Sequence, residues 1–328
     1  MTIQQSEIKF YKSASVNDTA SNGGYLSKNV VATDKIFPSA QNTERINGST
    51  KYRKIFVKVE NTDDLMFSNC LAFMLTNTPG EDTNVIAPGT QSDTQGSMTI
   101  PRWYGCGLTN EAAGSGGTTI TLVQDNTLTL FQHNDMAMIT DKTNSTDING
   151  NIEYFQVDTV GQTGGTVTLT IGNSYQLIHS FNSGAKVASV IDCGNVYAHS
   201  DNITKTSSAG TFDSANILCD SFGTIREDWT LTFTSPTEFM MTGDRVGVVA
   251  TGTKTTDYAP QNPDFNGHEY FAILSGAWGG TWQSGDTVVF KTYPAAAPIW
   301  FKRIIPQNCQ TISDNSFKFS VVGDSDGV

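Results

Sequence analysis

Apolar and polar residues alternate with a period of two along several stretches of this chain. Trp229, Leu231 and Phe233 fall on one face of an extended segment, and the threonines between them fall on the other. Residues 287–292 repeat this alternation directly after a Gly-Asp turn. No window sustains the helical period of 3.6 residues. The pattern therefore predicts an all-β fold of antiparallel strands joined by turns.

The composition supports this prediction. Charged residues make up 16% of the 328 residues, against roughly 25% in ordinary soluble domains. Threonine, serine, asparagine and glycine take their place, and these residues favour turns and solvated strand faces over helix interiors. This composition is common among extracellular and viral β proteins and rare among cytosolic metabolic enzymes.

The length allows two or three domains, each with its own core. The Gly-rich segment 111–117 is the best candidate for a linker. Five strand patterns follow it within about 75 residues, which is typical of a small barrel or roll inserted into a larger sandwich. We therefore expect a multidomain sandwich/barrel protein with an extended arm and first strand at residues 1–50, a β-sandwich-like region at 51–117, a small inserted β-barrel at 118–200 and a C-terminal β domain at 201–328.

Net charge and cysteine spacing narrow the partners and the compartment. The formal net charge is −12, and an acidic surface repels nucleic-acid phosphates and anionic membranes. The five cysteines contain no CxxC pair, so we expect buried free thiols in a protein that folds in a reducing cytoplasm. Neither a signal peptide nor an apolar run long enough to cross a bilayer is recognisable.

No residue cluster predicts catalysis or a cofactor. The four histidines are scattered without metal-binding spacing: His133, His179, His199 and His268. The acidic neighbours Glu227 and Asp228 would point to opposite faces of a strand, whereas glycoside hydrolysis needs two carboxyl groups that face each other across a sugar. We therefore expect a protein that is not an enzyme, with no cofactor. A virion-associated hydrolase whose site leaves no local motif remains a third class.

One segment has the spacing of a metal loop. The stretch from Asn262 to Gly267 alternates oxygen-bearing side chains and ends in glycine, like the first half of a calcium loop. The twelfth position of such a loop would be Ile273, where a bidentate glutamate is needed. A turn containing Pro263 before the next strand is the favoured interpretation. The alternative calcium ligands are Asn262, Asp264, Asn266 and Glu269.

Aromatic residues gather near the C-terminal end of the sequence. Rings so close in sequence form either a sheet core or subunit interface, which is the favoured interpretation, or an exposed platform for glycans. The residues concerned are Trp278, Trp282, Tyr293, Trp300 and Phe301.

Several segments carry a resemblance to a known family. They are residues 11–18, 48–54, 208–213, 223–234, 278–282 and 297–303. With these segments the chain resembles uncharacterised virion structural proteins encoded in the morphogenesis regions of Mu-like prophages and other tailed bacteriophages. The family has no catalytic residues to carry over. The resemblance implies a place in the virion without choosing between neck, tail, baseplate and a capsid-associated position.

Together these features predict a structural component of a tailed-phage virion that works by protein–protein assembly. We expect its partners to be copies of itself, as a homo-oligomer, and other virion proteins, without nucleic acid or membrane. It would fold in the host cytoplasm and be localised in the virion. The alternative is a receptor-binding or adhesion module that recognises host-surface glycans through the aromatic residues.

Overall fold

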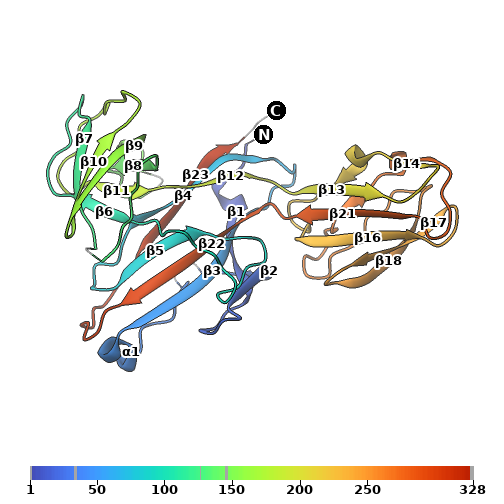
Figure 1. Cartoon of the computed structure of the whole chain (residues 1–328), viewed down its shortest axis with the longest axis horizontal. Coiled ribbons are helices and arrows are strands. Elements are labelled where there is room, and N and C mark those ends of the chain that lie inside the picture. Colours follow the sequence, from blue (N-terminus) through green and yellow to red (C-terminus); the bar gives the residue numbers. More distant parts are fainter. Residues whose placement is uncertain (1, 33–34, 126, 145–146, 326–328) are drawn as a thin grey trace.

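The computed structural model describes residues 2–32, 35–125, 127–144 and 147–325, and its regular structure is almost entirely β. Figure 1 shows three β units along the long axis of the molecule. A central unit, the body, carries a barrel on one side and a second sheet unit, the distal domain, on the other. The predicted all-β, multidomain antiparallel architecture is confirmed.

The body consists of two antiparallel sheets. The larger has the order β2-β1-β3-β22-β5, and the smaller has the order β12-β4-β23. Their strands are β1 (Ile8–Ser15), β2 (Gly23–Val30), β3 (Ser49–Val59), β4 (Phe67–Thr76), β5 (Thr83–Pro88), β12 (Ile191–Val196), β22 (Ala296–Ile305) and β23 (Lys318–Ser325). The short helices of the body are η1 (Gln5–Glu7) and α1 (Asn42–Asn47).

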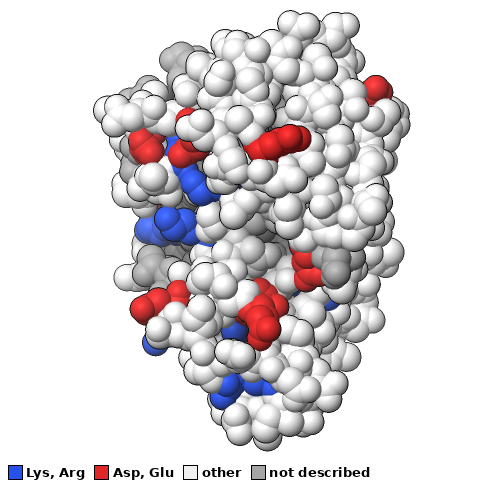
Figure 2. All heavy atoms as spheres, turned by 90° about the vertical axis from the view of Figure 1, so that its left-hand side faces the viewer, with Lys and Arg blue, Asp and Glu red and all other residues white. Residues whose placement is uncertain are grey.

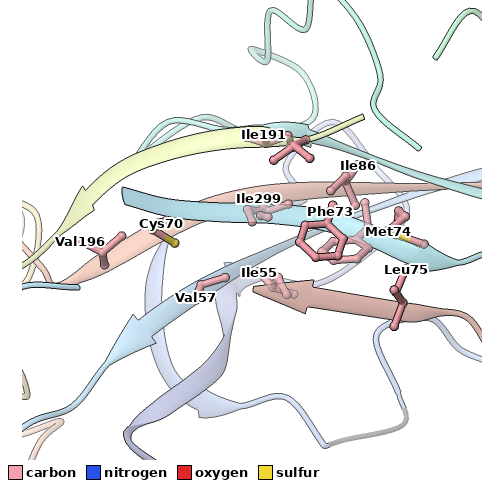
Figure 3. Close-up of a cluster of buried hydrophobic side chains, with 14 of the residues drawn as sticks. Ile55, Val57, Cys70, Phe73, Met74, Leu75, Ile86, Ile191, Val196 and Ile299 are labelled. Atoms are coloured by element: carbon pink, nitrogen blue, oxygen red, sulfur yellow. The ribbon is translucent and has the colours of Figure 1, made fainter. Parts of the chain in front are cut away.

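The body core lies between the two sheets, whose apolar side chains point toward one another (Figure 3). Ile55 and Val57 of β3 and Ile299 of β22 form one cluster with residues of β4. Cys70 and Phe73 are the β4 members, and all five side chains are almost completely buried. Burying an apolar side chain of this size contributes roughly 1.5–3 kcal/mol. The core thus joins strands that are far apart in the sequence.

The barrel is a closed six-stranded unit inserted between β5 and β12. Its order is β10-β7-β6-β11-β8-β9, and it closes because β9 pairs with β10. Its strands are β6 (Cys106–Thr109), β7 (Thr119–Val123), β8 (Met136–Thr140), β9 (Ile152–Thr163), β10 (Thr166–Ile171) and β11 (Lys186–Ser189). Ile120 and Leu122 alternate into its interior opposite Val167 and Leu169. The predicted small inserted barrel is confirmed.

The distal domain is a second insertion, between β12 and β22. Its main sheet has the order β13-β21-β16-β17-β18, and two small sheets, β14-β20 and β15-β19, accompany it. The distal domain has a core of its own, and Trp229, Leu231 and Phe233 are buried in it, as their alternation predicts. The elements are β13 (His199–Lys205), β14 (Gly210–Phe212), η2 (Ser214–Asn216), β15 (Ile217–Leu218), β16 (Glu227–Phe233), β17 (Glu238–Gly243), β18 (Gly247–Thr253), β19 (Ala272–Ile273), η3 (Ser275–Ala277), β20 (Trp278–Gly280) and β21 (Thr287–Tyr293).

The strand pairing groups the chain differently from the expected segments. The last strands of the segment 201–328 return to the body, where β22 lies between β3 and β5, and β23 pairs with β4. Much of the expected arm forms the β1–β2 hairpin in the larger body sheet. The expected linker at 111–117 is part of the barrel unit, where Ala113 exchanges two backbone hydrogen bonds with Phe181. The barrel runs from β6 to β11, so it begins before the expected segment 118–200, and β12, which lies within that segment, pairs in the body. These differences arise because long-range strand pairing leaves no local sequence pattern.

Candidate functional site

The aromatic residues singled out in the sequence lie in three separate places. Trp282 is fully buried in the distal core, and Trp278 packs half-buried beside it. Trp300 and Phe301 lie on β22 in the body and are also fully buried. Tyr293 lies half-buried at the end of β21, where the chain leaves the distal domain. The five rings therefore share no exposed surface on which a glycan would stack.

The proposed calcium-loop segment is folded as a turn whose polar groups contact other parts of the protein. The amide of Asn262 donates to the Gly223 carbonyl at 2.7 Å, and its side-chain oxygen accepts from the Asp264 backbone at 3.0 Å. Asp264 forms an exposed ion pair with Lys28 at 2.8 Å. Across the described ranges, no group of three or more His, Cys, Asp or Glu side chains is placed to hold a metal ion. The four residues named from the sequence as alternative calcium ligands are Asn262, Asp264, Asn266 and Glu269.

The histidines and paired carboxylates do not converge either. His179 contacts Glu153 in the barrel at 2.9 Å, and His268 contacts Asp220 in the distal domain at 2.7 Å. Glu227 is buried on β16, whereas the next residue, Asp228, faces the other side of the strand and is half-buried. Each group has a local structural partner, which matches the scatter of these residues in the sequence.

A groove with a cavity volume of about 920 Å³ lies between the barrel and the body. Leu108 of β6 and Val123 of β7 lie opposite each other at its barrel wall and are 50% and 48% exposed. Ile304 and Pro306, at the end of β22, line the body wall. Exposed apolar side chains that border a concave surface are typical of protein-binding sites.

One residue that lines the groove has a buried polar atom without a hydrogen-bond partner in the described part of the chain. Gln124, which follows β7, lines the groove and is 8% exposed. Its amide nitrogen donates to the Leu128 carbonyl at 2.7 Å, but within the described part of the chain its side-chain oxygen has no hydrogen-bond partner. An unpaired buried acceptor costs roughly 1–3 kcal/mol. Because this oxygen is itself buried, it lies beneath the surface of the groove and is not open to an incoming donor.

Acidic side chains beside the groove are held by the protein itself. The Thr83 hydroxyl donates to Asp125 at 2.5 Å, and Arg303 donates to Asp82 at 2.7 Å. The side of the molecule that carries the barrel shows mostly uncharged surface, with basic and acidic side chains interspersed (Figure 2). A surface with few charged side chains avoids the cost of burying unpaired charges when another protein covers it.

Charged groups are buried where the body meets the distal domain. The Lys58 ammonium group donates to Glu60 at 3.0 Å and to the Phe222 carbonyl of the distal domain at 2.5 Å. Tyr11 donates to the same carboxylate at 2.5 Å, and Lys9 pairs with it at 2.7 Å. Burial opposes ionisation of Glu60, but the lysines and Tyr11 outweigh it and hold its pKa below the usual value.

A second set of contacts fixes the same junction. The Ser221 hydroxyl donates to the Asn61 carbonyl at 2.7 Å, and the Asn61 backbone donates back to it at 3.1 Å. The Arg245 guanidinium lies 3.6 Å from the centre of the Tyr25 ring in the body. Buried hydrogen bonds have strict geometry, so these contacts orient the distal domain on the body.

Local sequence patterns predict neither the groove nor this junction. Ile55, Phe56 and Val57 are consecutive apolar residues, which is the one local sign that β3 is buried on both faces and that Lys58 is buried with it. Leu108 lies in a short strand without a distinctive pattern, and it comes to line the groove only when the chain has folded.

Comparison with known proteins does not assign the chain to a family. No family model and no curated protein matches the chain. Among solved structures, the infectious bursal disease virus VP2 subviral particle is similar over 82% of this chain and 82% of its own, at 11% identity and a TM-score of 0.11. A 7S globulin from Momordica charantia covers 92% of this chain and 85% of its own, at 6% identity and a TM-score of 0.12. Likenesses this weak carry no argument about fold or function. Among the described residues, no helix has the length and hydropathy to span a membrane.

Proposed function

We propose that this chain is a structural component of a tailed-phage virion and acts by protein–protein assembly. Its partners are copies of itself and other virion proteins at the neck, tail or baseplate, or on the capsid. The resemblance of residues 208–213, 223–234, 278–282 and 297–303 to virion structural proteins supports this proposal. So does the architecture, in which three β units are joined into one elongated molecule (Figure 1).

The observation that carries the proposal is the groove between barrel and body. It places the exposed apolar pair Leu108 and Val123 opposite Ile304 and Pro306 of the body wall. An extended segment of a neighbouring protein would supply apolar side chains that fit between these two walls. Binding by such a segment buries apolar surface that is otherwise exposed to water.

The test is incorporation of variants into particles made in a host that lacks the wild-type gene. Val123→Glu places a charge in the groove at a side chain that is half exposed, so the fold has room for it. We expect the amount of this variant in purified particles to fall by about tenfold or more, because burying an unpaired carboxylate opposes binding by well over 1.4 kcal/mol.

Val248→Glu is the matched control. Val248 is 65% exposed on β18 of the distal domain, away from the groove. This variant is expected to enter particles at the wild-type level. Normal incorporation of Val123→Glu would exclude the groove as the assembly surface, and absence of the wild-type protein from particles would exclude the virion role.

A further inference from the structure

Two cysteines from neighbouring strands of the smaller body sheet lie beside each other. Cys70 of β4 pairs with Gly194 of β12. The next residue of β4, Leu71, pairs with Asp192, so Cys193 remains as an extra residue that forms a β-bulge next to Cys70. Cys70 belongs to the body core and Cys193 packs against the same core, so the two side chains are neighbours.

The local backbone holds this bulge in place. Gly194 has φ +66°, a left-handed conformation that glycine adopts without strain. Its N–H donates to the Asp192 carboxylate at 2.8 Å. Across the strand pair, the Asn69 N–H donates to the Asn195 side chain at 3.1 Å. The position of Cys193 beside Cys70 is therefore fixed by contacts on both strands.

The two thiols differ in access to solvent. Cys70 is fully buried, whereas Cys193 is half-buried. Cys193 also lines a cavity of about 270 Å³ at the junction with the distal domain, beside His199 and Tyr293. The hydrogen bond to Cys193 and burial raise the pKa of the Cys70 thiol. A small oxidant therefore reacts with Cys193 first, while Cys70 beside it is shielded from solvent.

We propose that Cys70 and Cys193 form an oxidation site, at which hydrogen peroxide converts the two thiols into a cross-strand disulfide. The Cys193 thiolate attacks one peroxide oxygen, the O–O bond breaks, and the departing hydroxide takes up the thiol proton as water. Cys193 is then a sulfenic acid. The Cys70 sulfur attacks the Cys193 sulfur, the S–O bond breaks, and hydroxide leaves with the Cys70 proton as a second water. Two thiols lose two electrons and two protons, and one peroxide becomes two waters.

The disulfide would change the stability of the molecule. It closes a loop of about 120 residues that contains the entire barrel, and long loops lose the most freedom in the unfolded chain when they are cross-linked. We expect oxidation to raise the midpoint of thermal unfolding by roughly 5–10 °C and a reductant to reverse the change. The inference is independent of the assembly role, because it concerns contacts within one chain.

The experiment uses the full-length protein, freed of reductant and treated with hydrogen peroxide. Remaining thiols are alkylated, the protein is digested without reduction, and the peptides are identified by mass spectrometry. We expect one linked pair of peptides containing Cys70 and Cys193, about 2 Da lighter than the sum of the two thiol peptides.

Cys193→Ser is expected to lose the linked pair and the thermal shift, whereas the control Cys309→Ser keeps both. Cys309 is also half-buried, but it lies in the segment between β22 and β23. Accumulation of sulfinic acid on Cys193, or full alkylation of Cys70 and Cys193 after peroxide treatment, would overturn the proposal. The peptide map of the wild-type protein decides the matter even if a variant fails to fold.

Discussion

At the scale of single residues, the unusual feature is two lysines that are completely buried on one strand. Lys54 pairs with Asp93 at 2.6 Å, and Lys58 pairs with Glu60 at 3.0 Å. Burial lowers the pKa of both lysines, because the charged form loses its hydration. Each remains in place because a carboxylate and backbone carbonyls replace water. Removing one partner of such a pair leaves an uncompensated charge.

Glu60→Gln should therefore destabilise the protein by about 3 kcal/mol, since Lys58 loses its counter-charge in a buried site. The matched control is Asp264→Asn, which removes the exposed ion pair with Lys28 and should cost less than about 1 kcal/mol. Urea unfolding at neutral pH measures both free energies. Equal effects of the two substitutions would contradict the role assigned to the buried pair.

The same carboxylate predicts a dependence on pH. Because the pKa of Glu60 is lower in the folded protein than in the unfolded chain, its contribution to stability is present above about pH 4.5 and is lost as the pH falls through the folded value. The carboxyl groups of Asp18, Glu44 and Glu153 also have lowered pKa values and add to this acid sensitivity. The difference in unfolding free energy between wild type and Glu60→Gln should shrink below pH 4. A difference that stays constant down to pH 3 would contradict this assignment.

At the scale of elements, alternation along a strand decides which side chains hold the sheet. Leu231 of β16 is fully buried, whereas Thr230, its neighbour, points to the other face and is half-buried. Leu231→Ala should destabilise the distal domain by about 2–5 kcal/mol, because it removes buried methyl groups and leaves a cavity. Thr230→Ala should change the stability by less than about 1 kcal/mol. Tryptophan fluorescence during urea unfolding reports on this domain through Trp229 and its neighbours; similar losses for both variants would refute the assignment of the faces.

The same alternation explains what the sequence predicts well and what it does not. It places strands such as β16 and β21, since a period of two is a local property. It says nothing about pairing, so β22 is expected in the C-terminal domain 201–328 although it lies in the body sheet between β3 and β5. The groove shares this limit, because Leu108 and Ile304 meet there only after distant strands have paired.

At the scale of the whole molecule, the barrel and the distal domain are both insertions into one sandwich. The chain enters and leaves the distal domain at His199 and Tyr293, which are paired and whose rings stack 4.9 Å apart. Lys58 and Asn61 bind the same domain through its backbone and side chains, so it is held by more than its two connections. This arrangement suits a building block that keeps its binding surfaces at fixed positions, and it is consistent with the proposed assembly role.

Quantitative mass spectrometry of purified phage particles, released from a host that carries this gene, tests that role most directly. We expect the chain to be present in a fixed ratio to the other structural proteins and to remain after high-salt washing, because the proposed groove contact is mainly apolar. Its absence from particles that are otherwise complete, with the chain found only in the lysate, would contradict the proposed assembly role.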